Sequence, residues 1–140
     1  MALAERLARL HAGMAFVVQQ HAPTEAAVEA PFHGASARSA LLLAHARGVV
    51  LAVLGLSGVR VFEYSPATIK KAVTGNGRAE KEQVEAMVLR LVRGGSPPGK
   101  PDIADAIAAA VCHLFGTGYA DALNKAETPR LRRPSVPRRS

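Results

Sequence analysis

Cysteine is scarce in this chain, and the shortage excludes two kinds of covalent or metal-based stabilisation. Its 140 residues include one cysteine, Cys112, and no tryptophan. A single cysteine excludes an internal disulfide, and no spacing of cysteine and histidine suggests a zinc site, so the composition fits a reducing cytosol. Long hydrophobic runs are also missing, because the most apolar stretch, residues 48–58, is too short to span a bilayer. With no signal peptide at its start, the sequence predicts a soluble, cytoplasmic protein with no membrane partner.

Acidic residues are missing from the C-terminal end of the chain. The formal net charge is +7, but five of the 18 basic residues are arginines beyond Thr128, which leaves 13 bases against 11 acids in residues 1–127. This proline- and arginine-rich tail is expected to be disordered, and it either keeps the protein soluble or attracts a polyanion. We therefore predict one domain over residues 1–116, which is long enough for a single core, and a basic extension over 117–140 that is disordered from residue 128. The tail arginines are Arg130, Arg132, Arg133, Arg138 and Arg139.

Hydrophobic spacing predicts the element order α-β-α-β-α-α-α. Residues 59–64, VRVFEY, are the clearest strand, because β-branched and aromatic residues lie between turn signals. The strand at 25–29 is shorter and is expected to be buried. Two strands that bracket one helix predict a βαβ unit with parallel pairing. Two strands are too few to cover so many helices, so we expect further strands before Met1. The expected helices cover residues 3–21, 36–56, 68–73, 84–91 and 102–113.

Two aspartates open an otherwise apolar helix in the stretch PDIADAIAAAVCH, residues 101–113. Aspartate favours the first turn of a helix, where it caps free N–H groups and meets the positive end of the dipole, and this accounts for Asp102. Asp105 lies one turn later, so capping accounts for it less well. The pair is either a solvated helix start or a functional pair on a helix that is covered on both faces. The expected core face of this helix comprises Ile103, Ile107, Val111 and Leu114.

Glu29 ends the first strand, at the edge where sites collect in parallel α/β sheets. If the last helix packs beside this strand, Glu29 meets Asp102 and Asp105. Three carboxylates in one pocket repel one another unless a cation holds them together. Oxygen ligands suit magnesium or manganese, and paired ions of this kind support in-line cleavage of phosphodiesters. The alternative for Glu29 is simple exposure at a strand edge.

Four basic residues surround the glycine turn at 75–77. Their side chains and the free backbone amides of the turn suit phosphate groups, although a solvated surface is the plain alternative. Phe32 lies in an expected loop, where its ring either folds back onto the core or stacks on an unpaired base. His33, His45 and His113 receive no role, and a packed or buried ring is expected for each. The four basic residues are Lys70, Lys71, Arg78 and Lys81.

Four segments of the chain resemble one family in order and spacing. They read AVEAPF at 27–32, ARSALLLAHARG at 37–48, FEYSPATIKKAVTGNGRAEKEQV at 62–84 and DIADAIAAAVCH at 102–113. These motifs resemble the RuvC family of Holliday-junction resolvases, and the match covers nearly all of residues 3–115. The resemblance implies an RNase H-like α/β fold, a homodimer, and metal-dependent, symmetric nicking of two strands of a four-way DNA junction.

By position, the resemblance also implies roles for individual residues. Glu29, Asp102 and Asp105 match metal-binding carboxylates, which in the complete family fold hold two magnesium ions, with manganese as a substitute. Lys70 and Lys81 match basic residues near the scissile phosphate, so these five residues form the expected catalytic set. The implied partner proteins are the RuvA–RuvB branch-migration complex. The expected DNA-binding residues are Phe32, Arg38, Lys70, Lys71, Arg78 and Lys81.

The chain departs from the family pattern at several positions. It starts beyond the first strand of the family, whose Asp-Pro-Gly motif supplies another metal ligand, so the expected fold is incomplete at its N-terminus. Ser36, Leu42 and His45 stand where asparagine, lysine and glutamine are usual, which weakens phosphate contact from that helix. The Ala30-Pro31 pair replaces a polar-aliphatic pair and alters how the following aromatic ring is presented. Three hypotheses follow: a junction-cleaving nuclease, a junction-binding protein that cleaves little, or a chain that does not fold alone.

Overall fold

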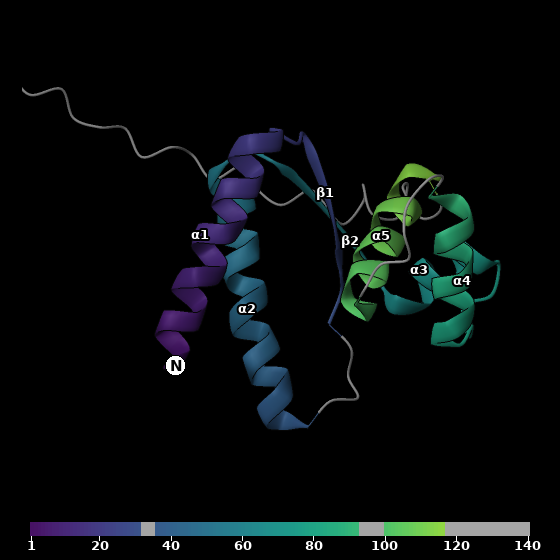
Figure 1. Ribbon diagram of the computed structural model, residues 1–140, viewed down its shortest axis with the longest axis horizontal. Helices are drawn as coiled ribbons and strands as arrows, with labels where there is room; N and C mark the ends of the chain where they lie inside the picture. Colours follow the sequence, from purple (N-terminus) through teal and green to yellow (C-terminus); the bar gives the residue numbers. More distant parts are fainter. Residues whose placement is uncertain (32–35, 93–99, 117–140) are drawn as a thin grey trace, which may run out of the picture.

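The computed structural model describes residues 1–31, 36–92 and 100–116, and its elements follow the predicted order (Figure 1). Helices and strands alternate as α-β-α-β-α-α-α in this part of the chain, which confirms the α/β class. The helices are α1 (Leu3–His21), α2 (Ala37–Leu56), α3 (Pro66–Thr74), α4 (Lys81–Leu91) and α5 (Pro101–Leu114), and the strands are β1 (Glu25–Glu29) and β2 (Arg60–Tyr64).

The two strands pair in parallel, as the βαβ pattern predicts, and Glu29 lies beside Tyr64 in the register. They form a two-stranded sheet within the described residues. β1 is only partly buried, so its prediction as a buried strand is wrong. The physical reason is that each strand of a two-stranded ribbon has one edge without a neighbouring strand to cover it.

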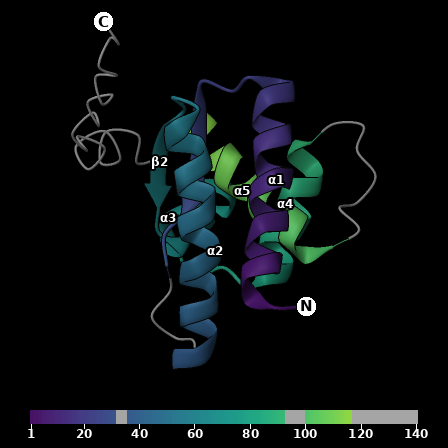
Figure 2. The same ribbon diagram turned by 90° about the vertical axis from the view of Figure 1, so that its left-hand side faces the viewer.

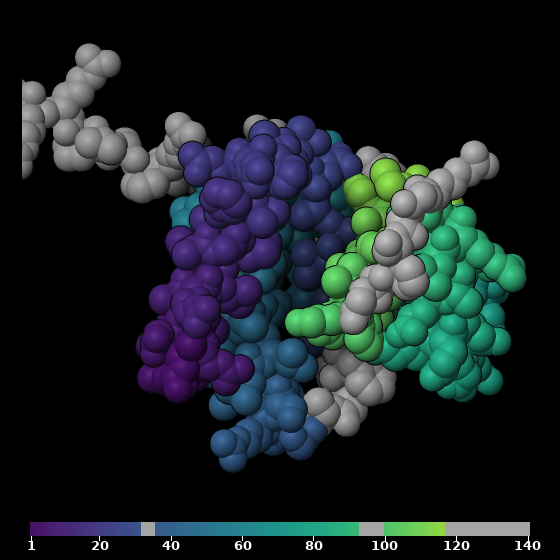
Figure 3. All heavy atoms as spheres, in the orientation of Figure 1, coloured from purple at the N-terminus to yellow at the C-terminus, as the bar shows by residue number. Residues whose placement is uncertain are grey.

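The helices form two layers, one on each face of the strands (Figures 1 and 2). On one face, α1 and α2 pack around Val18 and Leu54, and the strand residues Ala26 and Val28 join this cluster. On the other face, α3, α4 and α5 enclose Phe62 in the larger core. The sides alternate along each strand, as the pleat of a strand requires. In the space-filling view the two layers are two lobes that meet at the strands (Figure 3).

Local sequence sets the starts of α2 and α3. The side-chain oxygens of Ser36 and Ser65 accept hydrogen bonds from the amides of Ser39 (3.3 Å) and Thr68 (3.1 Å). Such N-caps satisfy backbone donors that a helix start otherwise leaves without a partner. Pro66 takes the first position of α3, where its fixed φ suits a helix and its missing N–H costs nothing.

The start of α5 differs from the predicted one. Lys100, not an aspartate, holds the N-cap position, and it makes no side-chain capping bond. Asp102 lies one position into the first turn. Asp102 therefore lies in the first turn as predicted, where its negative charge favours the positive end of the helix dipole, but it does not hold the N-cap position.

The buried face of α5 also differs from the predicted stripe of large residues. Ile103 and Leu114 are 47% and 79% exposed, whereas Val111 is buried as expected and Ile107 is partly buried. Small side chains take the core positions because α5 packs against β1, α3 and α4 at once, and close approach on several sides leaves no room for larger ones. The buried residues of α5 are Ala104, Ala108, Ala109, Val111 and Cys112.

Among the described residues, α2 is the helix that is long and apolar enough to cross a membrane by length and composition, and 11% of that window is buried. Its apolar surface extends beyond residues 48–58, because Leu41 and Leu43 are exposed as well. In the structure α2 is nevertheless part of one helix layer of the α/β fold, together with α1. It packs against α1 and β2, and its Arg47 forms an ion pair with Glu63 on β2.

Candidate active site

Glu29 lies at the C-terminal end of β1, and α2 holds the backbone there. The guanidinium group of Arg47 donates to the carbonyl oxygen of Glu29 (Nη1···O 2.6 Å) and pairs with the Glu63 carboxylate (Nη2···Oε2 2.8 Å). The Arg47 side chain is 20% exposed and that of Glu63 is 48% exposed, so water still screens part of this ion pair. One arginine thereby ties α2 to the C-terminal ends of both strands.

The carboxyl group of Glu29 shares its surroundings with charged groups from three helices. Glu29 is exposed overall at the strand end, but the surrounding protein removes part of the water from its carboxyl group and so raises the pKa of Glu29 above the ordinary 4.5, and the negative charge of Asp105 raises it further. The ammonium groups of Lys70 and Lys81 act in the opposite direction. Lys81 also contacts Asp105 directly, with Nζ 3.5 Å from Oδ2. β1, α3, α4 and α5 thus contribute two acids and two bases to one site.

Asp102 is exposed in the first turn of α5 and is not among the groups that shift the pKa of Glu29. Within residues 1–31, 36–92 and 100–116, no group of three or more Asp, Glu, His or Cys side chains lies close enough to share a metal ion. Asp105 is therefore the carboxylate whose charge reaches Glu29, and Asp102 as a third ligand stays a prediction. Phe32 and His33 lie outside the described residues.

The basic residues expected to contact phosphate lie on both sides of the turn between α3 and α4, with one exception. Lys70 is partly buried and Lys71 is exposed on α3, while Lys81 is the first residue of α4. Arg78 lies in the turn, where its backbone N–H donates to the Asn76 side chain (2.9 Å). The exception is Arg38, which is exposed at the start of α2 in the other helix layer.

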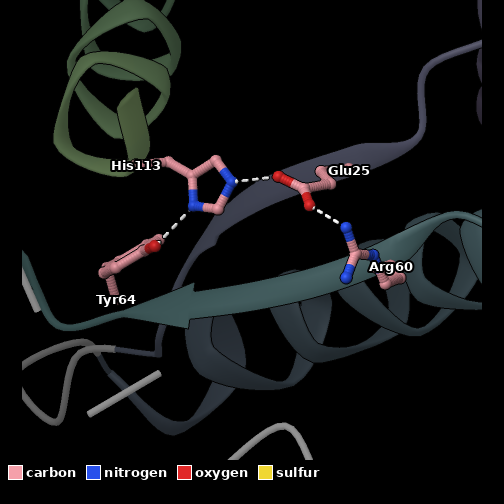
Figure 4. A network of polar contacts seen from close by, with 4 residues as sticks. All are labelled: Glu25, Arg60, Tyr64 and His113. Atoms are coloured by element: carbon pink, nitrogen blue, oxygen red, sulfur yellow. Dashed lines mark hydrogen bonds and ion pairs between the residues drawn. The ribbon is translucent and has the colours of Figure 1, made fainter. Parts of the chain in front are cut away.

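A polar network that sequence reasoning misses joins α5 to both strands (Figure 4). Nε2 of His113 lies 2.8 Å from Oε2 of Glu25, and Nδ1 lies 2.6 Å from the hydroxyl oxygen of Tyr64. The other carboxylate oxygen of Glu25 pairs with Arg60. The His113 side chain is 11% exposed, and its ring centroid lies 4.6 Å from that of Phe62. His113 is thus packed, as expected, and it also connects α5 to β1 and β2.

The Glu25 carboxylate makes part of the stability dependent on pH. Its hydrogen bond with His113 lowers the pKa of Glu25 below 4.5, loss of surrounding water acts in the opposite direction, and the charge of Arg60 lowers the pKa further by a smaller amount. Because the folded pKa is below the unfolded one, the stabilisation is complete above pH 4.5 and is lost as the pH falls through the folded value. We expect the thermal midpoint of the wild type to fall more steeply below pH 4.5 than that of Glu25→Gln. Parallel midpoint curves for the two proteins would contradict this.

Comparison with known proteins gives one consistent result for the sequence. A family model described as "Crossover junction endodeoxyribonuclease RuvC" matches residues 1–113. The chain is similar to crossover junction endodeoxyribonuclease RuvC of Anaeromyxobacter dehalogenans (strain 2CP-C), with 48% identity over 118 residues, which are 84% of this chain and 63% of that relative. It is 50% identical over 124 residues to RuvC of Zymomonas mobilis subsp. mobilis, covering 86% of this chain and 74% of the relative. The chain spans 53–63% of the length of three Anaeromyxobacter relatives.

Two solved structures share the fold. One is Thermus thermophilus RuvC, with a TM-score of 0.77, and the other is RuvC of the same organism in complex with Holliday junction substrate, with a TM-score of 0.80. Each is 33% identical in sequence, and each match covers 87% of this chain and 74% of the other. These matches confirm the predicted RNase H-like α/β fold.

Proposed function

Because this chain belongs to the RuvC family of crossover junction endodeoxyribonucleases, we propose that it makes paired, symmetric nicks in four-way DNA junctions. One observation carries the proposal: at Glu29, the last residue of β1, the charge of Asp105 raises the pKa and the charges of Lys70 and Lys81 lower it, and Lys81 Nζ lies 3.5 Å from Asp105 Oδ2. Acids beside fixed positive charges suit a reaction in which negative charge develops on a phosphate. The substrate class is supported by Thermus thermophilus RuvC, whose structure is known in complex with Holliday junction substrate.

The family also implies a divalent metal ion, and the donor set of Glu29 and Asp105 fits one. Magnesium prefers oxygen ligands and is usually held by one or two carboxylates together with substrate phosphates. Two carboxylates therefore suffice for a site that DNA completes, and we propose Asp102 as the third ligand. When bound, such an ion polarises the phosphate and lowers the pKa of its bound water. The proposed metal is magnesium, two ions in the complete family site, with manganese as a substitute.

The side chains of the site prepare it for cations and phosphate. Because burial and Asp105 raise the pKa of Glu29, its ionised form is destabilised in the free protein and gains from any added positive charge. Lys81 neutralises Asp105 while no substrate is bound, and its ammonium group is free to turn to a phosphate when a cation takes over that role. Lys70 supplies a second positive charge from α3.

The rest of the proposal concerns DNA and partners. Lys71 and Arg78 extend the basic surface around the α3–α4 turn, and we propose Phe32 and Arg38 as further DNA contacts on the basis of the family resemblance. A homodimer suits a four-way junction because two equivalent sites then face a substrate that has its own near-twofold axis. By the same resemblance, the RuvA–RuvB complex is the proposed protein partner and the cytoplasm the proposed location.

A second candidate, a junction-binding protein that cleaves little, is favoured by one observation. In the part of the chain that the structure describes, the carboxylates do not form a cluster of three or more potential metal ligands. Two ligands hold a metal ion less tightly than three, so binding without efficient cleavage is the expected outcome if Asp102 does not join the site.

The two candidates are separated by incubating the 140-residue chain with a synthetic four-way junction labelled on each strand. If the chain is a nuclease, we expect paired, symmetric nicks in two strands that require magnesium or manganese, with an intact linear duplex as the control. Retarded migration of the junction in a native gel without nicking, at any concentration of either metal, would instead support the junction-binding protein.

Lys81→Ala is expected to slow nicking of bound junction more than it weakens binding. Lys81 lies at Asp105, where its charge stabilises the transition state, and loss of one such group costs about 100-fold in rate. Lys71→Ala is the matched control, because it removes one positive charge from the neighbouring surface. It is expected to weaken junction binding without slowing single-turnover nicking of saturated DNA. Equal losses of affinity and no change in single-turnover rate for both variants would contradict the proposed role of Lys81.

A further inference from the structure

We propose that the contacts of His113 with Glu25 and Tyr64 set the axial position of α5 on β1 and thereby hold Asp105 beside Glu29. His113 and its two partners are then positioning residues, since they act on the proposed site through the helix. The inference rests on the proposed function for the meaning of the Glu29–Asp105 pair. The part of the inference that concerns the position of α5 rests on the contacts of His113 alone.

Two nearly equal distances, one along β1 and one along α5, support this proposal. Glu25 and Glu29 lie on the same face of β1, four residues apart, which corresponds to about 13 Å along a strand. Asp105 and His113 lie eight residues apart on α5, which corresponds to about 12 Å along a helix. His113 contacts Glu25 at one end, and Asp105 acts on Glu29 at the other. Helix and strand therefore run in opposite directions with two matched pairs of residues.

The packed face of α5 gives little axial specificity by itself. Three of its five buried residues, Ala104, Ala108 and Ala109, have short side chains, and Val111 and Cys112 complete the packed face. The alanine part of this face fits a neighbouring strand at more than one axial position with a small loss of packing, so Val111 and Cys112 alone limit a shift of the helix by shape. Directional hydrogen bonds add the missing specificity, since they are satisfied at one position only.

The network also fixes the helix relative to both strands at once. Both ring nitrogens of His113 form hydrogen bonds, one with Glu25 on β1 and the other with Tyr64 on β2 (Figure 4). Tyr64 lies beside Glu29 in the strand register. The contact of its hydroxyl group with His113 therefore connects α5 to the strand ends where the proposed site lies. The ring of Phe62 lies against the His113 ring, with centroids 4.6 Å apart and planes tilted by 38°, and limits the rotation of that ring.

The test compares the full chain with three network variants and one matched control. His113→Ala removes both hydrogen bonds, Tyr64→Phe removes one at nearly constant volume, and Glu25→Gln keeps an acceptor for the ring. Val111→Ala is the control, because it removes buried apolar volume from the same turn of α5 and leaves the polar contacts intact. Thermal midpoints for all proteins report the loss of stability alone.

Two further measurements report positions. In the metal-free protein, nuclear Overhauser effects between the Ala27 methyl group and the methyl groups of Ala108 and Ala109 report the axial position of α5, because these residues belong to one core. In a titration with manganese, the concentration that broadens the amide signals of Glu29 and Asp105 by half reports how well the two carboxylates act together.

We expect His113→Ala to alter the Overhauser pattern and to raise the manganese midpoint about tenfold or more, the size known for groups that orient metal ligands. Tyr64→Phe is expected to act in the same direction, which keeps the test decisive if His113→Ala does not fold. Glu25→Gln and Val111→Ala are expected to keep the wild-type pattern and midpoint.

The inference is overturned if His113→Ala and Tyr64→Phe lower the thermal midpoint yet keep the wild-type Overhauser pattern, as the control does. Failure of the proposed function looks different. In that case manganese broadens neither Glu29 nor Asp105 in the wild type, while the Overhauser pattern of the metal-free variants still decides whether the network positions the helix.

Discussion

Glu29→Gln is expected to reduce nicking of a four-way junction by more than about 100-fold, because loss of a direct ligand costs at least as much as loss of a group that only orients one. The amide of glutamine keeps the size of the side chain but not its negative charge. The Arg47 contact is made to the backbone carbonyl of residue 29, so the substitution leaves that contact in place. Junction affinity without metal is expected to be unchanged or higher, since one negative charge leaves the DNA-facing site. Single-turnover nicking and gel-shift titration measure the two quantities.

The same substitution is expected to raise the stability of the metal-free protein at neutral pH. The pKa of Glu29 is raised in the folded state, so folding favours its protonated form. Stability from this group is therefore greatest below pH 4.5 and declines as the pH rises through the folded pKa. Glutamine resembles the protonated acid and does not suffer this decline. A higher thermal midpoint at pH 7 together with lost nicking is the signature of a residue kept for function at a cost in stability.

Glu5→Gln is the matched control for this prediction. It makes the same change in net charge on α1, in the other helix layer, where Glu5 is exposed. It is expected to leave nicking and the thermal midpoint close to those of the wild type. If Glu29→Gln nicks junctions at the rate of Glu5→Gln, Glu29 has no part in the reaction and the proposed site is wrong.

Phe62→Ala is expected to lower the free energy of unfolding by about 3–5 kcal/mol. Phe62 is 2% exposed and is one of the largest fully buried side chains among the described residues. It lies in the larger core with buried residues of α3, α4 and α5 and packs against the His113 ring. Alanine leaves a cavity that the surrounding helices cannot fill without moving. Urea denaturation followed by circular dichroism measures the change.

Phe16→Ala serves as the control for that measurement. Phe16 has the same side chain but is 63% exposed on α1, so its loss is expected to change the free energy of unfolding by about 0.5 kcal/mol or less. A loss below about 1 kcal/mol for Phe62→Ala would contradict the fold, because the full burial of a phenylalanine is worth more than that.

The element order and the strand pairing could be predicted because local rules govern them. Ser65 and Pro66 mark the start of α3 by their own chemistry, and a short strand–helix–strand segment has few alternatives to parallel pairing. Glu29 could be placed at a strand end for the same reason. Its meeting with Asp105 follows from the packing of α5 on β1, a prediction that required one assumption about topology.

The buried face of α5 could not be predicted by the same means. Hydrophobicity favours Ile103 and Leu114 over alanine, but the distance between packed elements decides which side chains fit. That distance depends on β1, α3 and α4 together. The His113 network was beyond reach for a related reason. Its partners Glu25 and Tyr64 are 88 and 49 residues away in sequence, and the strand EAAVE offers an acid at each end without showing which of them meets the helix.

The short strand β1 has a consequence for how this chain tolerates insertions and deletions. Glu25 and Glu29 face α5 because an even number of steps separates them. One extra residue between them would turn Glu29 toward α1 and α2, and one fewer would do the same. Insertions and deletions therefore preserve the orientation of Glu25 and Glu29 toward α5 only when they fall in the connections between elements. We expect natural sequence variants of this chain to differ in length there and not within residues 25–29.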